Sequence, residues 1–252
     1  MSDTKIILAL HTKPTDELKG IVDENRDLYF PVCGGARLKD CGDEWIRENV
    51  LMDDSEPDNI SNLNPFLNEL TPLYLVWKNN PDKVFKMTGT ANIGLCHYRR
   101  LFKPDVVSVI DTVDGIIAQP ESLGVSGFNC TLEKQYGLCH YAEDFKIFRE
   151  TLIDLNLFDA EVWREWSRGN YLYAPCNCFI LKREWFNIFC EVLFKVAFEL
   201  VKRIDVKGRT PYQQRACSFL CERFTSYWFY KQNYRRKMIL KEVGMVWRRD
   251  WR

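Results

Sequence analysis

The sequence predicts an α/β fold in which helices flank a mostly parallel central sheet and the C-terminal portion is helical. Two short apolar runs end abruptly in polar residues, after Leu10 and after Cys96. Buried strands of open α/β sheets deliver side chains to the carboxyl edge in this way. Long amphipathic segments at 183–203 and 212–230 predict helices in the second half. With 252 residues the chain can bury one large core, and we interpret it as a single domain.

The composition excludes several classes of protein. A hydrophobic content of 46% and a charged content of 28% are typical of a folded globular protein. The formal net charge is zero, so no global field would attract nucleic acid, and we expect no nucleic-acid partner. Any anion site must therefore be local. No apolar run approaches the ~20 residues that a membrane-spanning helix needs.

The cysteines predict reduced thiols in a cytoplasmic protein. All ten are dispersed along the chain, and the apolar run at 6–10 is too short for a signal peptide. None of them forms a C-x-x-C pair, so we expect core cysteines and no zinc site.

The first strand is predicted at 5–10 and places His11, Thr12 and Lys13 at its carboxyl end, where ligands of α/β proteins bind. A short edge strand at 29–33 and a Gly-Gly turn follow. The next predicted elements are an irregular loop at 53–64 and a helix at about 65–79, which could restart at Pro72.

Small polar residues of the irregular loop have two interpretations. Asp58, Asn59 and Asn64 can hold tight turns, or they can contact the hydroxyl groups of a sugar. The sequence alone leaves both open.

The segment after the second apolar run is the most informative part of the sequence. His97, Tyr98, Arg99 and Arg100 follow that run directly. Two adjacent guanidinium groups suggest an anionic ligand, because their geometry matches phosphate or carboxylate oxygens. The alternative is that both arginines are solvated or pair with structural carboxylates.

Further along, a buried strand is predicted at 116–118 and a loop at 121–129, followed by a polar cluster at a helix entry. Glu143 or Asp144 near His140 could form a general-base constellation, preceded by Gln135 and Tyr136. Alternatively, Asp144 could cap the next helix or form an ion pair with it.

In the last third, Asn177 interrupts a strand-like run at 174–181. A buried amide needs hydrogen-bond partners, so Asn177 either braces a loop or faces a ligand. Glu222 lies beside Arg223 and could form a structural ion pair. The segment 231–252 is rich in basic residues and tryptophan, so it could contact an anionic membrane surface or be a solvated terminus.

Several common motifs are absent from the sequence. It has no Walker loop, G-x-G-x-x-G, G-x-S-x-G or H-E-x-x-H pattern. The D-x-D pair of many metal-dependent sugar transferases is also missing. Asp111 and Asp114 have the wrong spacing, and Asp53 and Asp54 lie in a loop with no clear strand before them.

An ordered set of motifs resembles a family of glycosyltransferase-associated domains from capsular-polysaccharide and O-antigen gene clusters, long catalogued as a domain of unknown function. The first motifs are Lys5-Ile6-Ile7 with His11-Thr12-Lys13, Asp58-Asn59-Ile60-Ser61 with Asn64, Glu69-Leu70-Thr71 with Tyr74 and Trp77-Lys78-Asn79, and Gly94-Leu95-Cys96-His97-Tyr98-Arg99-Arg100. The later ones are Gln135-Tyr136, His140 with Asp144, Asn177-Cys178-Phe179-Ile180, and Arg215 with Glu222-Arg223.

The resemblance implies a GT-A-like fold and transfer of a hexose, galactofuranose in some members, from a nucleotide-sugar to a hydroxyl group of a glycan or lipid-linked glycan. A UDP-sugar is the expected donor. The segment 1–120 would bind it, 121–230 would serve the acceptor, and 231–252 would form a basic tail, placing the protein in the cytoplasm, at the inner membrane surface if the tail binds there.

On this interpretation the segments 11–13 and 97–100, with the loop residues Asp58, Asn59 and Asn64, bind the donor. Asp144 or Glu143, oriented by His140, would deprotonate the acceptor. Further acceptor-side residues would be Gln135, Tyr136, Asn177 and Glu222. We expect no metal ligands, because arginines stand where D-x-D is usual, although a divalent metal stays open. The alternative function is a non-catalytic nucleotide- or carbohydrate-binding module.

Overall fold

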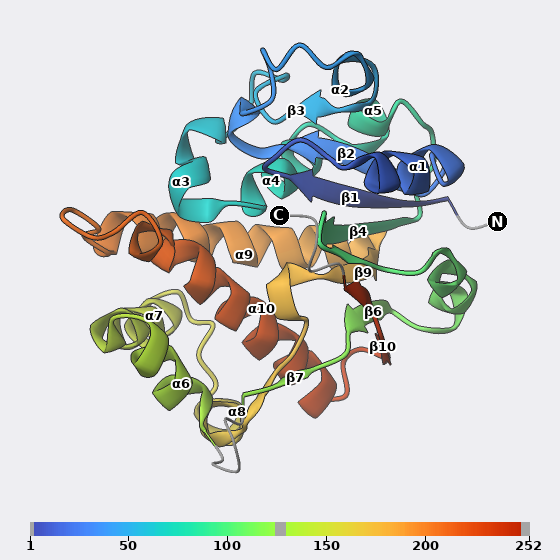
Figure 1. Cartoon of the computed structure of the whole chain (residues 1–252). Helices are drawn as coiled ribbons and strands as arrows, with labels where there is room; N and C mark the ends of the chain where they lie inside the picture. Colours follow the sequence, from blue (N-terminus) through green and yellow to red (C-terminus); the bar gives the residue numbers. More distant parts are fainter. Residues whose placement is uncertain (1–2, 124–129, 248–252) are drawn as a thin grey trace.

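The computed structural model describes residues 3–123 and 130–247, and it has a mixed α/β architecture built on one central sheet (Figure 1). The main path of this sheet is, in spatial order, β10 (Leu240–Val243), β6 (Gly115–Ala118), β9 (Phe179–Lys182), β4 (Asn92–His97), β1 (Thr4–Leu10), β2 (Tyr29–Cys33) and β3 (Leu51–Met52). Within this path β9 is the strand that runs antiparallel to its neighbours. The remaining strands are β5 (Arg100–Leu101), which pairs with β11 (Val246–Trp247), and the ribbon of β7 (Glu121–Ser122) and β8 (Tyr171–Leu172).

Helices cover both faces of the sheet. The α-helices are α1 (Asp16–Glu24), α2 (Glu44–Asn49), α3 (Asn64–Leu67), α4 (Leu70–Lys78), α5 (Pro81–Phe85), α6 (Leu132–Cys139), α7 (Ala142–Asp154), α8 (Ala160–Arg168), α9 (Arg183–Arg203) and α10 (Ala216–Tyr234). Short 3-10 turns are η1 (Gly34–Ala36), η2 (Ser61–Leu63), η3 (Pro104–Thr112), η4 (Pro175–Asn177) and η5 (Gln213–Arg215). Figure 1 shows α6, α7 and α8 gathered at the opposite end of the molecule from α2 and β3.

The central strands are buried on both faces, as the continuous apolar run of β1 predicts. Ile7, Ile93 and Leu95 belong to the larger core, which α4, α9 and α10 cover. Ile6 and Leu8 point to the smaller core on the other face, under α1, α2 and η3. This alternation follows from the two-residue period of a strand.

Most predicted elements are confirmed, and α9 has the predicted bounds. Three predictions are wrong, and one of them is the strand-like run at 174–181, in which Pro175–Asn177 form η4 and the strand β9 begins at Phe179. The strand at 29–33 is not an edge, because β3 pairs with its last two residues. The predicted helix at 65–79 breaks at Asn68 and Glu69 rather than at Pro72, and Asn68 has a φ of 46°. Pro72 lies in the first turn of α4, where a missing N–H costs no hydrogen bond.

Candidate functional site

Three neighbouring parallel strands deliver side chains to one edge of the sheet. The strands β2, β1 and β4 lie side by side and end at Cys33, Leu10 and His97. The rings of His11 and His97 are consequently 5.6 Å apart between centroids, and that of Tyr98 lies 4.3 Å from His97. Both segments therefore lie at the carboxyl edge of the sheet, as their positions after the two apolar runs predict.

The turn after β2 approaches this edge closely. A Cβ atom on Gly34 would lie 2.5 Å from Asn64 Nδ2 and 3.3 Å from His11 Cε1. Gly35 has a φ of 67°, which favours glycine. Asn64 donates to the carbonyl of Asn68 at 2.9 Å, so its side chain is fixed where the turn passes.

Asp53 holds this turn in place. Its carboxylate accepts hydrogen bonds from the backbone N–H groups of Gly35 and Ala36 at 2.7 and 2.9 Å. The hydroxyl groups of Ser61, at 2.6 Å, and Thr71 also donate to it. The sequence interpretation missed this role, because it found no strand before Asp53 and the two residues of β3 are too few to recognise.

Four arginines surround the two imidazoles. Burial, followed by the positive charges of Arg37, Arg215 and Arg99, lowers the pKa of His11 to about 4. The pKa of His97 lies well below its usual value, again chiefly through burial, with His11, Arg99, Arg100 and Arg215 adding to the effect. Both rings are therefore neutral at pH 7. We call His11, Arg37, His97, Arg99, Arg100 and Arg215 the cationic edge.

Backbone geometry gives His97 a defined orientation. The N–H of Arg99 donates to His97 Nδ1 at 3.4 Å, which leaves the ring proton on Nε2. The guanidinium of Arg99 lies 5.2 Å from the centre of the Tyr98 ring. The two side chains after the strand are thus ordered by the strand end itself.

Polar atoms without partners concentrate around the cationic edge. Within residues 3–123 and 130–247, four buried side-chain atoms near it make no hydrogen bond, namely His11 Nε2, Asn64 Oδ1, Asn68 Nδ2 and Arg215 Nε. An unpaired buried donor or acceptor costs ~1–3 kcal/mol. Folded proteins seldom leave such groups unpaired, so these atoms indicate a surface that binds a polar ligand.

A second network joins the end of β4 to α10. The guanidinium of Arg100 contacts the thiol of Cys176, whose backbone N–H donates to Glu222 at 2.6 Å. Glu222 accepts a further hydrogen bond from Arg223 at 2.6 Å, and Arg223 donates to Gln135 at 2.8 Å. Glu222 and Gln135, both predicted on the acceptor side, are therefore connected to the cationic edge.

Asn177 is part of a third network in the interior. Its amide Nδ2 donates to Glu69 Oε1 at 2.8 Å, and its Oδ1 accepts from the hydroxyl of Thr225 at 2.6 Å. Because protein groups bind both ends of this buried amide, the contacts favour a bracing role for Asn177 over direct contact with a ligand.

With this geometry in view, a comparison with known families is informative. Residues 5–233 match DUF4422, described as a domain of unknown function. The chain belongs to the DUF4422 family. No curated protein matches this DUF4422 chain.

The DUF4422 chain also matches a solved structure titled as WbbM, a bifunctional glycosyltransferase, in its apo form. The TM-score is 0.76 at 17% identity, and the match covers 98% of this chain and 46% of that one. At this identity the likeness shows the fold, which is the predicted GT-A-like α/β fold. The DUF4422 chain spans a little less than half the length of the WbbM chain.

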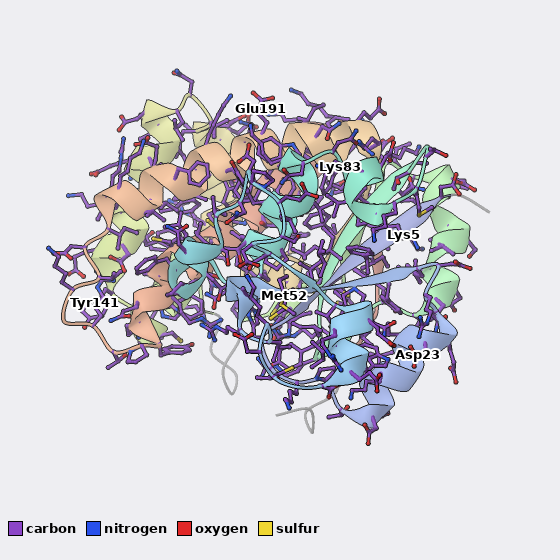
Figure 2. All side chains as sticks on the ribbon, turned by 90° about the horizontal axis from the view of Figure 1, so that it is seen from above. Lys5, Asp23, Met52, Lys83, Tyr141 and Glu191 are labelled. Atoms are coloured by element: carbon purple, nitrogen blue, oxygen red, sulfur yellow. The ribbon has the colours of Figure 1, made fainter. Side chains whose placement is uncertain are left out.

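The predicted general-base cluster lies in a different environment. Asp144 is buried, and both its oxygens accept hydrogen bonds from Arg209, at 2.5 and 2.9 Å. This geometry favours the alternative in which Asp144 forms a structural ion pair. Glu143 is exposed on the outer face of α7. Figure 2 shows Tyr141, just before these residues, at one end of the molecule and Met52, which ends β3, nearer its middle.

His140 belongs to an aromatic cluster. Its ring lies 4.2 Å from Phe219 and 4.8 Å from Tyr136 between centroids, and its Nδ1 lies 3.3 Å from Gln213 Oε1. Burial lowers the pKa of His140. Tyr136 itself is fully buried, so it contributes to the core under α6.

Other predicted donor-binding residues have local roles. Thr12 and Lys13 are exposed, and Lys13 donates to the carbonyl of Cys41 at 3.0 Å. Asp58 accepts from the hydroxyl of Tyr74 at 2.9 Å. Asn59 closes a turn through Glu56. For Asp58 and Asn59 the turn interpretation accounts for the contacts, whereas Asn64 reaches the cationic edge.

Sequence reasoning left Arg37, Glu69 and Arg215 out of the site. Glu69 and Arg215 belong to the motifs that carry the family resemblance, and this was the signal that could have found them. Arg37 follows the Gly-Gly turn after β2, but recognising it required placing that turn beside His11.

The donor set of the edge does not fit a divalent metal. Guanidinium groups and neutral imidazoles surround the strand ends, and Asp53, the carboxylate that holds the neighbouring turn, already accepts four hydrogen bonds. In the described part of the chain, no group of three or more His, Cys, Asp or Glu side chains is arranged to hold an ion.

Much of the predicted basic tail is built into the fold. Residues 231–234 end α10, and 240–243 form β10. Arg235 forms ion pairs with Asp159 and Glu161. The prediction of a tail is therefore wrong for this part, and 248–252 lie outside the described residues. Among the helices that the structure describes, none is long and apolar enough to cross a membrane.

Proposed function

We propose that this DUF4422 protein is a glycosyltransferase that moves a hexose from a nucleotide-sugar to a hydroxyl group of a glycan acceptor. The single observation that carries the proposal is the cationic edge, four arginines around two neutral imidazoles at the carboxyl ends of three parallel strands. The fold supports it, because a chain titled as a bifunctional glycosyltransferase shares that fold over 98% of this chain.

A nucleoside diphosphate fits the charge of this edge. Arginines offer paired N–H donors that match phosphate oxygens, and neutral imidazoles can donate hydrogen bonds without adding charge. As the bond between the sugar and the diphosphate breaks, negative charge grows on the leaving oxygens. Fixed cations stabilise that charge. We accordingly propose that transfer proceeds without a divalent metal, with a UDP-hexose, galactofuranose included, as donor.

The acceptor would approach from the side of β6 and β10. A cavity of about 350 Å³ opens beside Arg100, between the ends of these two strands. It is lined by Arg100, Ala118, Gln119, Pro120, Glu121, Pro175, Gly244 and Met245. This position would bring an acceptor hydroxyl, from a free or a lipid-linked glycan, to the donor held at the cationic edge.

A panel of UDP-hexoses with glycan acceptors tests the proposal. Release of nucleoside diphosphate should depend on acceptor and persist in EDTA. Arg99→Ala should weaken donor binding roughly 10- to 100-fold, as loss of a charge-assisted hydrogen bond implies. The exposed Arg47 of α2 gives a matched control, Arg47→Ala, which should bind like wild type.

Three outcomes would count against parts of the proposal. Donor binding without any turnover favours the non-catalytic module. Loss of turnover in EDTA rejects metal-free transfer. Equal donor affinity in Arg99→Ala and wild type rejects the diphosphate role of the edge.

A further inference from the structure

The described residues include three buried carboxylates, and they differ in how fully they are engaged. Asp53 accepts four hydrogen bonds and Asp144 accepts two from Arg209. Glu69 is also buried, at 8% exposure, but forms no ion pair within residues 3–123 and 130–247. Asn177 donates to its Oε1, and the backbone N–H of Glu69 itself also reaches the carboxylate, so its hydrogen-bond partners are neutral groups.

Burial makes Glu69 a stronger base than an ordinary carboxylate. Burial and then the charge of Glu222 raise the pKa of Glu69, while the hydrogen bonds from its own backbone N–H and from Asn177, and the charge of Arg215, oppose the rise. Ion pairing with a cation would instead have made the carboxylate a weaker base. A carboxylate with a raised pKa accepts a proton from a hydroxyl group more readily near neutral pH.

Glu69 also lies next to the donor side of the proposed site. Arg215 acts on Glu69 and on both imidazoles of the cationic edge, so the three groups share one electrostatic neighbourhood. Asn64, which lies against Gly34 and His11, donates to the carbonyl of Asn68, the residue before Glu69. The backbone at Asn68 has the rare φ of 46°, and Glu69, the next residue, is the buried N-cap residue of α4.

Glu222, the other acid in this neighbourhood, is already committed. Its two oxygens accept from the backbone of Cys176 and from Arg223. Taking up a proton there would break a hydrogen bond to a guanidinium, which costs about 1.5–3 kcal/mol. Glu69 has no such partner to lose.

We propose that Glu69 is the catalytic base of the transfer and that Asn177, held by Thr225, positions it. This inference rests on the proposed glycosyltransferase function. The proton of the acceptor hydroxyl passes to the carboxylate of Glu69 as the oxygen lone pair forms the bond to the anomeric carbon. The bond from that carbon to the diphosphate oxygen breaks, and its electron pair leaves with the nucleoside diphosphate, whose charge the cationic edge stabilises. A single displacement of this kind inverts the anomeric configuration.

The primary test compares Glu69→Gln with Glu150→Gln, which removes an exposed acid of α7. General-base catalysis contributes roughly 10²- to 10⁴-fold, so Glu69→Gln should lose turnover by at least about 100-fold. Its affinity for the nucleotide-sugar should stay that of wild type, because the diphosphate contacts are untouched. Glu150→Gln should turn over normally.

Chemical rescue separates a base from a structural residue. Formate supplied to Glu69→Ala should restore part of the turnover, because a small carboxylate can take the place of the missing one. Formate should leave Glu69→Gln, whose side chain fills that place, unrescued. If formate rescues neither variant, Glu69 is not the base.

The positioning role of Asn177 is tested by the pH dependence of kcat/KM, which a purely structural role would leave unchanged. Besides the amide of Asn177, the titratable and charged groups that interact with Glu69 are Glu222, Arg215, Cys176, Cys178 and Cys221. The hydrogen bond from Asn177 lowers the pKa of Glu69, so Asn177→Ala should shift the acidic limb of the kcat/KM profile to higher pH. An unshifted limb overturns the positioning role.

The failures of the two proposals are distinguishable. If wild type transfers from no nucleotide-sugar, the proposed function fails, and this inference fails with it. If wild type is active and Glu69→Gln equals it, only the inference is overturned. A product with retained anomeric configuration, measured on wild type alone, also overturns it and requires no variant to fold.

Discussion

Arg209 donates two hydrogen bonds to Asp144, at 2.5 and 2.9 Å, and so joins the start of α7 to the segment before η5. The side chain of Asp144 is only 2% exposed and that of Arg209 13% exposed. The pair also orders the ring of Tyr141, which lies 4.3 Å from the guanidinium. Because both oxygens of Asp144 are bound by a guanidinium, we expect this carboxylate to stabilise the fold and not to accept a proton from a substrate.

We therefore predict that Asp144→Asn destabilises the protein by about 3 kcal/mol, because the guanidinium of Arg209 keeps its charge and loses its partner. Denaturant unfolding measures this. Asp154→Asn, which removes an exposed pair with Arg203, is the matched control and should change little. If Asp144→Asn unfolds like wild type but has lost turnover, Asp144 serves catalysis instead.

Asp53→Asn should cost about 3 kcal/mol of unfolding free energy and weaken donor binding. An amide cannot accept all four hydrogen bonds, and the turn at Gly35 and Ala36 would lose one of its anchors. Asp54→Asn removes a neighbouring exposed ion pair with Lys39 and should be nearly silent. Unfolding curves and donor titration of both variants check this, and equal behaviour would contradict it.

Gly34→Ala should reduce donor affinity. The new Cβ atom would lie 2.5 Å from Asn64 Nδ2, and Asn64 is fixed by hydrogen bonds to Asn68 and Thr71. Crowding of this kind costs about 1–3 kcal/mol. Gly20→Ala in α1 meets no atom within 4 Å and should stabilise the protein by about 0.5–1 kcal/mol. Donor binding by Gly34→Ala at the wild-type level would show that the turn does not shape the site.

Acid should destabilise the protein through His11. The unfolded imidazole takes up a proton below its ordinary pKa of 6.5, whereas the pKa of His11 in the fold is about 4. Between these values the unfolded state binds more protons, so the free energy of unfolding falls as pH falls.

At about pH 5, His11 should lower the free energy of unfolding by about 2 kcal/mol relative to neutral pH. His11→Asn should lose that part of the pH dependence. Urea unfolding at the two pH values measures it, and an equal acid loss in the variant would mean that His11 is not held neutral.

Sequence patterns predicted much of the fold because most elements carry local signals. The pattern of apolar residues alone predicts the buried strand β1 and the amphipathic helix α9. Very short strands such as β3 are not, since two residues have no period. The break at Asn68 was missed because Pro72 is the more conspicuous helix-breaking signal in the sequence. A proline in the first turn of a helix does not interrupt that helix, and Pro72 lies in the first turn of α4.

The site was predictable where it follows strand ends and not where it depends on folding partners. His11 follows β1 directly, and residues 97–100 lie at or just after the end of β4, so position in the sequence fixes their place. The engagement of Asp144 could not be foreseen, because its partner Arg209 lies 65 residues away in a loop. Glu69 likewise depends on Asn177, which is 108 residues away.

The pairing of β4 with β9 has a consequence for how the protein is made. β4 carries His97 and pairs with β1 on one side. On its other side it pairs with β9 (Phe179–Lys182), which comes far later in the chain. During synthesis that apolar edge stays open until the second half emerges, and an isolated fragment of residues 1–120 would keep it open for good. We expect such a fragment to aggregate. Attempts to dissect donor binding from transfer should therefore use point variants of the whole chain and not truncation.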